Sequence, residues 1–317
     1  MSELWEYANL YLNGIPTYRA RQKRTGIAPR RVAELCLDMM ARVGEPANAR
    51  TIHLTEWGNG AFREVIGQFR DAFSGLSGTL VLMGSLADNT ATGYSDLDAV
   101  YFPPDEEFAG SPEKIRRALV KAGRVILSFD HLQHHGVFIL PESIARKRSP
   151  LPASALQGAV LLSGKTEIIL GGWENSWKTN LFPILNKCEK LARNPRARPK
   201  SLYGIKLLLS QIMLLPSLFL LAMGKDVSKA RSFSLVREML RDDLPALDLA
   251  TKLRASWKRP CSRAFKAGLA LSPSPWDFAF AFRRFFRPPA ETWLALDTGF
   301  YEDAGRLARR MRDALEG

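Results

Sequence analysis

Two short pieces of the chain carry residue types that do chemistry together. The first is Gly84-Ser85, directly after an apolar run, and the second is the pair Asp96 and Asp98, which begins after ten further residues. Residues alternate between faces along a strand, so an Asp-x-Asp pair points both carboxylates to one side. Two neighbouring carboxylates repel unless a cation lies between them. Mg²⁺ is a natural occupant, because it prefers oxygen ligands and leaves positions open for phosphates.

Gly84 and Ser85 add the features of a phosphate site. Glycine lets the backbone approach a ligand closely, and Ser85 offers a hydroxyl to a phosphate oxygen. A helix that starts at this point would present free N–H groups to an anion. A metal held by paired acids beside a phosphate cradle is the arrangement that nucleotidyl transfer needs. The chain has no GxxxxGK[ST], HExxH or GxSxG motif, and no GxGxxG after a strand, that would point to another chemistry.

The pattern of Gly-Ser, ten residues and Asp-x-Asp resembles the DNA polymerase beta superfamily of nucleotidyltransferases. In GSLADNTATGYSDLDAVYF the Thr/Gly spacer and Ser95 before the first acid are also similar to that family. The resemblance covers roughly residues 76–140. It implies that Asp96 and Asp98 are catalytic and bind two Mg²⁺ ions, or Mn²⁺ in their place, and that Gly84, Ser85 and Ser95 contact an NTP such as ATP.

The resemblance implies three further site residues. A third acid usually lies on a following strand, and Asp130, at the end of a predicted strand, is the candidate catalytic residue and metal ligand. Its context FDHLQHHG departs from the family's apolar-Asp-apolar pattern, and the alternative is an ordinary turn aspartate. Lys229 and Ser232 are candidates to contact the triphosphate from the later helical region. A solvated basic loop is the alternative for that segment.

Three of the four histidines, His131, His134 and His135, follow Asp130 closely. A zinc site is disfavoured, because no cysteine joins them and because His134 and His135 would face opposite sides of a strand. Two interpretations stay open. One of these histidines faces the acids as a base or a phosphate contact, or all are ordinary surface or hairpin residues.

The strands and helices expected around these residues indicate an α+β protein. Residues 1–75 are predicted as an N-terminal helical segment packing on the core, residues 76–172 as a nucleotidyltransferase core with a small mixed sheet, and residues 173–317 as a helical domain for substrate or nucleotide, similar to the domain that follows the core in many members of the family. Within the core we predict strands at 79–83, 97–102, 125–129 and 136–140. A helix is expected to begin at Ser111-Pro112 and to end at Gly123.

Charge predicts an anionic partner. The formal net charge is +13, and Lys and Arg contacts dominate affinity for nucleic acids. We expect RNA, including tRNA ends, as the acceptor, bound through the basic stretches Arg19–Arg31 and Lys187–Lys206. A small-molecule or second-messenger nucleotidyltransferase, an enzyme that modifies a protein, and a non-enzymatic nucleic-acid-binding protein stay open, and so does a protein partner.

Three scattered cysteines without a CxxC pair argue against a disulfide framework and favour a reducing, cytoplasmic location. The acidic start of the chain is unlike a signal peptide. The apolar segment 207–223 contains polar residues and Pro216. It therefore predicts a buried pair of helices broken near the proline rather than a membrane span.

Overall fold

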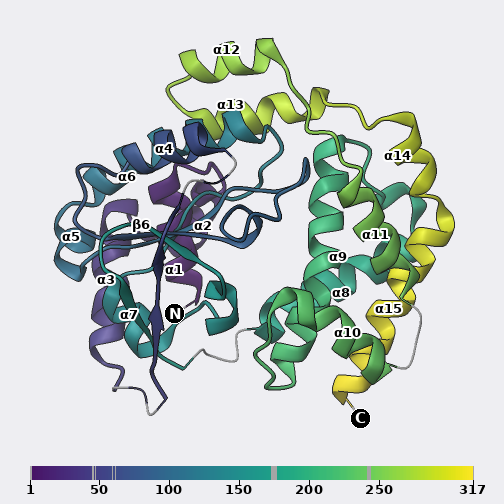
Figure 1. The fold of residues 1–317 in the computed structure, drawn as a ribbon, viewed down its shortest axis with the longest axis horizontal. Helices are drawn as coiled ribbons and strands as arrows, with labels where there is room; N and C mark the ends of the chain where they lie inside the picture. Colours follow the sequence, from purple (N-terminus) through teal and green to yellow (C-terminus); the bar gives the residue numbers. More distant parts are fainter. Residues whose placement is uncertain are drawn as a thin grey trace. The chain divides into compact units, whose positions relative to one another are not determined.

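The computed structural model describes residues 2–44, 46, 48–58, 60, 62–172, 177–240 and 244–316. The chain divides into two compact units (Figure 1). The first unit comprises residues 1–91, 95–174 and 259–282, and the second comprises residues 92–94, 175–258 and 283–317. The fold is α+β, with a small mixed sheet in the first unit and helices at both ends of the chain.

The first unit combines short strands with helices. Its strands are β1 (Arg50–His53), β2 (Thr55–Glu56), β3 (Thr79–Met83), β4 (Asp98–Phe102), β5 (Phe138–Ile139), β6 (Val160–Ser163) and β7 (Glu167–Leu170). Its helices are α1 (Ser2–Asn13), α2 (Tyr18–Thr25), α3 (Val32–Ala41), α4 (Arg63–Asp71), α5 (Asp105–Gly110), α6 (Pro112–Phe129), α7 (Glu142–Arg148), α12 (Arg263–Leu271) and α13 (Pro275–Phe282), with 3-10 turns at Pro29–Arg31, Gly84–Leu86 and Ala153–Leu156.

The central sheet has five strands in the order β2-β6-β3-β4-β5. β3 lies in the middle and is antiparallel to both neighbours, whereas the two outer pairs are parallel. All five residues of β3 are buried, as a continuous apolar run predicts for a strand covered on both faces. The predicted strands at 79–83 and 97–102 are therefore confirmed, the second beginning one residue later than expected.

The N-terminal segment is not wholly helical, which corrects the expectation for residues 1–75. β1 pairs antiparallel with β7, and β2 pairs parallel with β6. These short strands are largely exposed, so they lack the apolar alternation that marks a half-buried strand in sequence. Their partners lie more than a hundred residues further along the chain, where local pattern cannot reveal them.

Helix α6 is longer than expected. The strand predicted at 125–129 is wrong, because these residues form the last turns of α6, with Ile126 and Leu127 on its buried face. Gly123 does not end the helix. A Cβ atom at this position would lie 2.8 Å from the indole nitrogen of Trp276 in α13, so this glycine serves close helix packing rather than a C-cap.

Helix α1 covers the free edge of the sheet beside β5. Asn13 donates to the carbonyl of Val137 and accepts from its N–H, at 2.8 and 2.9 Å. Asn9 does the same for Ile139, at 3.0 and 2.7 Å. Two side-chain amides thus replace the backbone of a missing strand and satisfy an edge that would otherwise stay unpaired. The segment after His135 is fixed in place by this arrangement.

The second unit is helical in its described part. It contains α8 (Trp177–Arg193), α9 (Leu202–Ala222), α10 (Lys229–Leu240), α11 (Pro245–Ala255), α14 (Ala290–Ala295) and α15 (Thr298–Glu316), with 3-10 turns at Pro195–Ala197 and Arg283–Phe285. α9 packs against α8, α10 and α11, and α15 packs along α8. The predicted break at Pro216 is wrong, since α9 continues through it. α9 is the one described helix long and apolar enough to cross a membrane, and 67% of its most apolar window is buried within the protein.

Candidate functional site

Asp96 and Asp98 lie at the point where a loop enters β4. Asp98 is the first residue of that strand and pairs in register with Met83, the last residue of β3. The side chain of Asp96 is 12% exposed and that of Asp98 is 29% exposed. Both approach the same imidazole ring, that of His135. The two carboxylates therefore converge, as the Asp-x-Asp spacing predicts.

Gly84 brings the backbone directly against Asp98. Its φ is +70°, in the left-handed region, and a Cβ atom would lie 2.9 Å from Oδ2 of Asp98. Only glycine meets both conditions without strain. Gly84 and Ser85 form a short 3-10 turn, and the hydroxyl of Ser85 donates to that of Ser95 at 2.8 Å. The structure thus joins Gly84, Ser85 and Ser95 to the acid pair.

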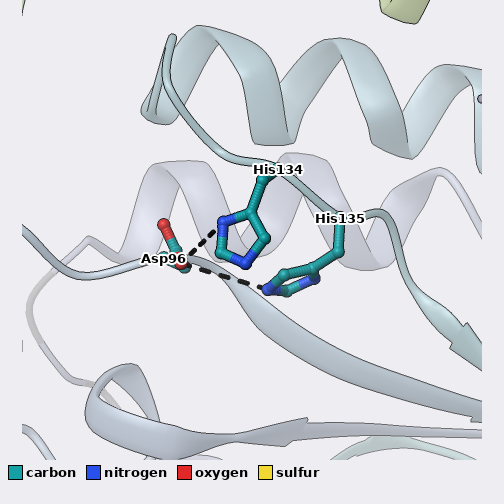
Figure 2. A group of neighbouring side chains, drawn as sticks. All are labelled: Asp96, His134 and His135. Carbon is teal, nitrogen blue, oxygen red and sulfur yellow. Dashed lines mark ion pairs between the residues drawn. The ribbon is translucent and has the colours of Figure 1, made fainter. Parts of the chain in front are cut away.

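His134 and His135 both turn toward Asp96 (Figure 2). Nδ1 of His134 lies 3.8 Å from Oδ2 of Asp96, and Nε2 of His135 lies 4.0 Å from the same oxygen and 3.1 Å from Oδ1 of Asp98. The expectation that the two rings face opposite sides is wrong, because they lie in a loop before β5 and not on a strand. Of the two open interpretations, the structure favours histidines that face the acids.

The charge of His135 follows from this position. Burial alone would lower its pKa, but the hydrogen bond to Asp98 and the negative charges of Asp98 and Asp96 outweigh burial and raise the pKa to about 9. At neutral pH the ring is therefore an imidazolium ion that neutralises part of the charge of the acid pair.

Gln133 joins the segment that carries Asp96 and Asp98 (the acid segment) to the loop that carries His134 and His135 (the histidine loop). The sequence did not reveal this role. Its side-chain oxygen accepts from the N–H of Leu97 at 2.9 Å, and its side-chain nitrogen donates to the carbonyl of Leu97 at 2.8 Å. The same nitrogen donates to the carbonyl of His135 at 3.2 Å. Gln133 and Leu97 are fully buried. Because Leu97 stands between the two acids, this amide fixes both carboxylates relative to both imidazoles.

Asp130 does not lie on a strand, which corrects the expected position of the third acid. It follows the last residue of α6, is fully buried, and accepts from the N–H of Leu132 at 3.1 Å. This backbone hydrogen bond is the pattern of the alternative interpretation, a turn aspartate. Among described residues, the donor atoms that converge within 4.8 Å of one another belong to Asp96, His134 and His135. A catalytic or metal-binding role for Asp130 stays a prediction.

Arg259 is a second residue that sequence reasoning missed. It donates to the carbonyl of Ser95 at 3.2 Å, and its guanidinium stacks 3.8 Å from the centre of the Phe129 ring. Burial lowers the pKa of Arg259, while the charges of Asp130 and Asp96 act in the opposite direction. No motif marks it, because it lies 164 residues from Ser95 in the chain. It holds the residue that precedes the acid pair.

His131 has a structural role distinct from that of the other two histidines. Its ring stacks on Phe265 with centroids 4.2 Å apart. Nδ1 lies 2.9 Å from the carbonyl of Leu127, so it is the protonated nitrogen, and Nε2 accepts from the N–H of Ser262 at 3.3 Å. This ring therefore ties the start of α12 to the end of α6, and it holds the segment that carries Arg259.

Lys229 and Ser232 belong to the second unit, at the start of α10. Lys229 is exposed. The hydroxyl of Ser232 is fully buried, donates to the carbonyl of Lys229 at 2.7 Å and lies 3.1 Å from that of Ser217. These bonds stabilise the first turn of the helix. Contacts of either residue with a triphosphate stay a prediction.

Many cations of the two basic stretches already have partners inside the protein. In the first stretch the ion pairs are Arg19–Asp277, Arg21–Glu6 and Arg24–Glu3. In the second, Lys187 donates to Gln211 at 2.7 Å. Lys206 is fully buried, with its ammonium 5.1 Å from the ring centre of Tyr94. Sequence-level charge therefore overstates the free positive charge of these stretches.

Comparisons with known proteins identify no relative of this chain. No protein-family model matches the chain, and no curated protein or solved structure matches it at a significant level.

Proposed function

We propose that this protein is a metal-dependent nucleotidyltransferase, which moves NMP from an NTP to an acceptor hydroxyl and releases pyrophosphate. One observation carries the proposal. The Gly84-Ser85 turn packs so tightly on Asp98 that a Cβ atom would lie 2.9 Å from its carboxylate. A phosphate held by this turn would therefore lie beside the two acids, which is where a divalent cation must meet a triphosphate.

The donor set fits a divalent cation. Asp96 and Asp98 offer carboxylate oxygens, and both remain partly exposed to an incoming ligand. When bound, the metal would neutralise the triphosphate and favour ionisation of the acceptor hydroxyl. The backbone at Gly84 and the hydroxyl of Ser85 would bind the phosphates. Gln133 keeps the acid segment in one position, so little reorganisation is needed as charge develops.

The proposed acceptor is RNA, on the basis of the net charge of +13. Phosphate contacts by Lys and Arg would dominate this affinity. The internal ion pairs of Arg19, Arg21 and Arg24 reduce the share of that charge available for RNA. Small-molecule and protein acceptors therefore remain outcomes of the test.

A labelling assay tests the proposal. The full chain is incubated with each α-³²P nucleotide, Mg²⁺ or Mn²⁺, and a cell lysate as the source of acceptors. Asp96→Asn and Asp98→Asn should both abolish transfer, and Asp96→Asn should do so without loss of stability. Asp88→Asn is the matched control, because Asp88 is exposed in the same loop and its Oδ1 accepts from the N–H of Thr90. Transfer that persists near the wild-type level in both acid variants would refute the assignment.

The destination of the label identifies the acceptor. Label in RNA supports the RNA acceptor and names the base. Label in a small product or on a polypeptide replaces RNA by that acceptor class. Absence of transfer with every nucleotide and either metal would contradict nucleotidyl transfer by this chain.

A further inference from the structure

We propose that Asp96, His134 and His135 bind one divalent first-row transition-metal ion, of the class that prefers mixed nitrogen and oxygen ligands. The inference rests on the proposed function for the role of the ion, and it deepens that function by naming the class of metal. The three donor atoms come from two loops of the first unit and face one another (Figure 2).

The orientation of His135 carries the argument. Nδ1 lies 3.0 Å from the carbonyl of Gly136, and a carbonyl only accepts, so Nδ1 is the nitrogen that holds a proton. Nε2 then faces Oδ1 of Asp98, 3.1 Å away, and Oδ2 of Asp96, 4.0 Å away. A bare nitrogen and carboxylate oxygens repel at this distance, so a cation must lie between them. In the metal-free protein a proton on Nε2 meets that need, and a bound metal ion would displace that proton.

The surroundings of His135 favour a metal in this role. Histidine ligands of metals almost always donate their other ring N–H to a carbonyl or carboxylate, which fixes the tautomer and the ring orientation. The bond to Gly136 supplies this contact. Asn13 packs directly against Gly136, where a Cβ atom would lie 2.1 Å from its Oδ1, and its amide bonds to the backbone of the next residue, Val137. Gln133 adds a hydrogen bond to the carbonyl of His135 at 3.2 Å. The ring is therefore held with Nε2 directed at the acids before any ligand binds.

The donor set and its dimensions select the kind of ion. Imidazole nitrogen suits zinc, iron, copper and nickel, whereas Mg²⁺ prefers oxygen ligands alone. Metal–ligand bonds of about 2.0–2.2 Å place ligand atoms roughly 3.3–3.6 Å apart in a tetrahedral site. Oδ2 of Asp96 lies 3.8 Å from Nδ1 of His134 and 4.0 Å from Nε2 of His135. All three donor atoms lie within 4.8 Å of one another, so side-chain movements of about an ångström would close this set on an ion.

Cobalt binding tests the site without any assay of activity. Co²⁺ is added to the metal-free full chain, and its visible absorption reports the ligand field. We expect one Co²⁺ per chain, with affinity reduced about tenfold or more in His134→Ala and in His135→Ala. His53→Ala is the matched control, because His53 is exposed on β1 and pairs with Glu167. It should bind Co²⁺ like the wild type, and Mg²⁺ at equal concentration should not displace the ion.

A second measurement uses only the wild-type chain, so it does not depend on the folding of a variant. Mn²⁺ is bound in place of Co²⁺, and pulsed electron paramagnetic resonance should detect coupling to imidazole ¹⁴N. Wild-type affinity for Co²⁺ in both histidine variants, displacement of Co²⁺ by equimolar Mg²⁺, or bound Mn²⁺ without nitrogen coupling would each overturn the proposal.

The labelling assay separates this failure from failure of the proposed function. If the chain binds Co²⁺ through these histidines but transfers no nucleotide, the metal-site proposal stands and the proposed function fails. If the chain transfers nucleotide but both histidine variants bind Co²⁺ with wild-type affinity, the proposed function stands and the metal-site proposal fails.

Discussion

Replacement of Gln133 by Leu should destabilise the first unit by removing the clamp between the acid segment and the histidine loop. The variant keeps the approximate shape of the side chain but removes its oxygen and nitrogen. Leu97 then loses its partners at 2.9 and 2.8 Å, and the carbonyl of His135 loses one at 3.2 Å. Leu97 is fully buried, so water cannot replace these bonds without structural change.

The expected magnitude follows from the groups left without partners. A buried polar group that loses its hydrogen bond costs about 1–3 kcal/mol, so the two groups of Leu97 predict a loss of roughly 2–6 kcal/mol in the free energy of unfolding. Urea unfolding followed by tryptophan fluorescence measures this loss. Hydrogen exchange at the Leu97 amide gives a local readout, and we expect its protection to fall in the variant.

Gln68→Leu is the matched control for this experiment. Gln68 is an exposed residue of α4 whose amide contacts Glu64 at the surface, so its replacement should change stability by less than about 0.5 kcal/mol. If Gln133→Leu costs no more than Gln68→Leu, or if the Leu97 amide stays protected, the inferred clamp is wrong.

Two further predictions concern a glycine and the cysteines. Gly84→Ala should abolish nucleotide transfer and lower stability more than Gly26→Ala, because both glycines have φ near +70° but a Cβ atom has open space at Gly26. The difference between the two variants in urea unfolding isolates the clash with the acid, and equal losses would contradict it. Cys261 alone should react with a thiol reagent in the native state at pH 8. Burial raises the pKa of Cys36 and Cys188 to about 12, whereas Cys261 is exposed. Counting reactive thiols before and after denaturation checks this, and three in the native state would disprove it.

The sequence predicted the parts of the site that depend on neighbours in the chain. The apolar run 79–83 and the spacing from Gly84 to Asp98 identify two adjacent strands and the carboxylates at the start of the second. Hydrophobic pattern is reliable there, because β3 and β4 are almost wholly buried. The glycine directly after a buried strand predicted a close approach to a ligand, which stays a prediction, whereas the close approach in the structure is to the side chain of Asp98.

The parts that the sequence did not predict depend on contacts between distant segments. Gln133 clamps a residue 36 positions away, and Arg259 reaches Ser95 across 164 positions. Neither residue type has a pattern that marks such a role. The two adjacent histidines were misplaced for a related reason. The assumed strand before them is the end of α6, so strand alternation does not apply to the loop that follows.

Electrostatics of the acid pair decide which substitution gives the clearest test of function. Nε2 of His135 lies 3.1 Å from Asp98 but 4.0 Å from Asp96. Asp98→Asn therefore removes the hydrogen-bonded partner of a partly buried cation, and leaving such a charge unpaired is costly to stability. Asp96→Asn leaves that pair in place, and the amide of Asn retains nearly the volume of the carboxylate. Loss of nucleotide transfer in Asp96→Asn therefore reports on the chemistry of the site, whereas loss in Asp98→Asn also includes the unpaired imidazolium.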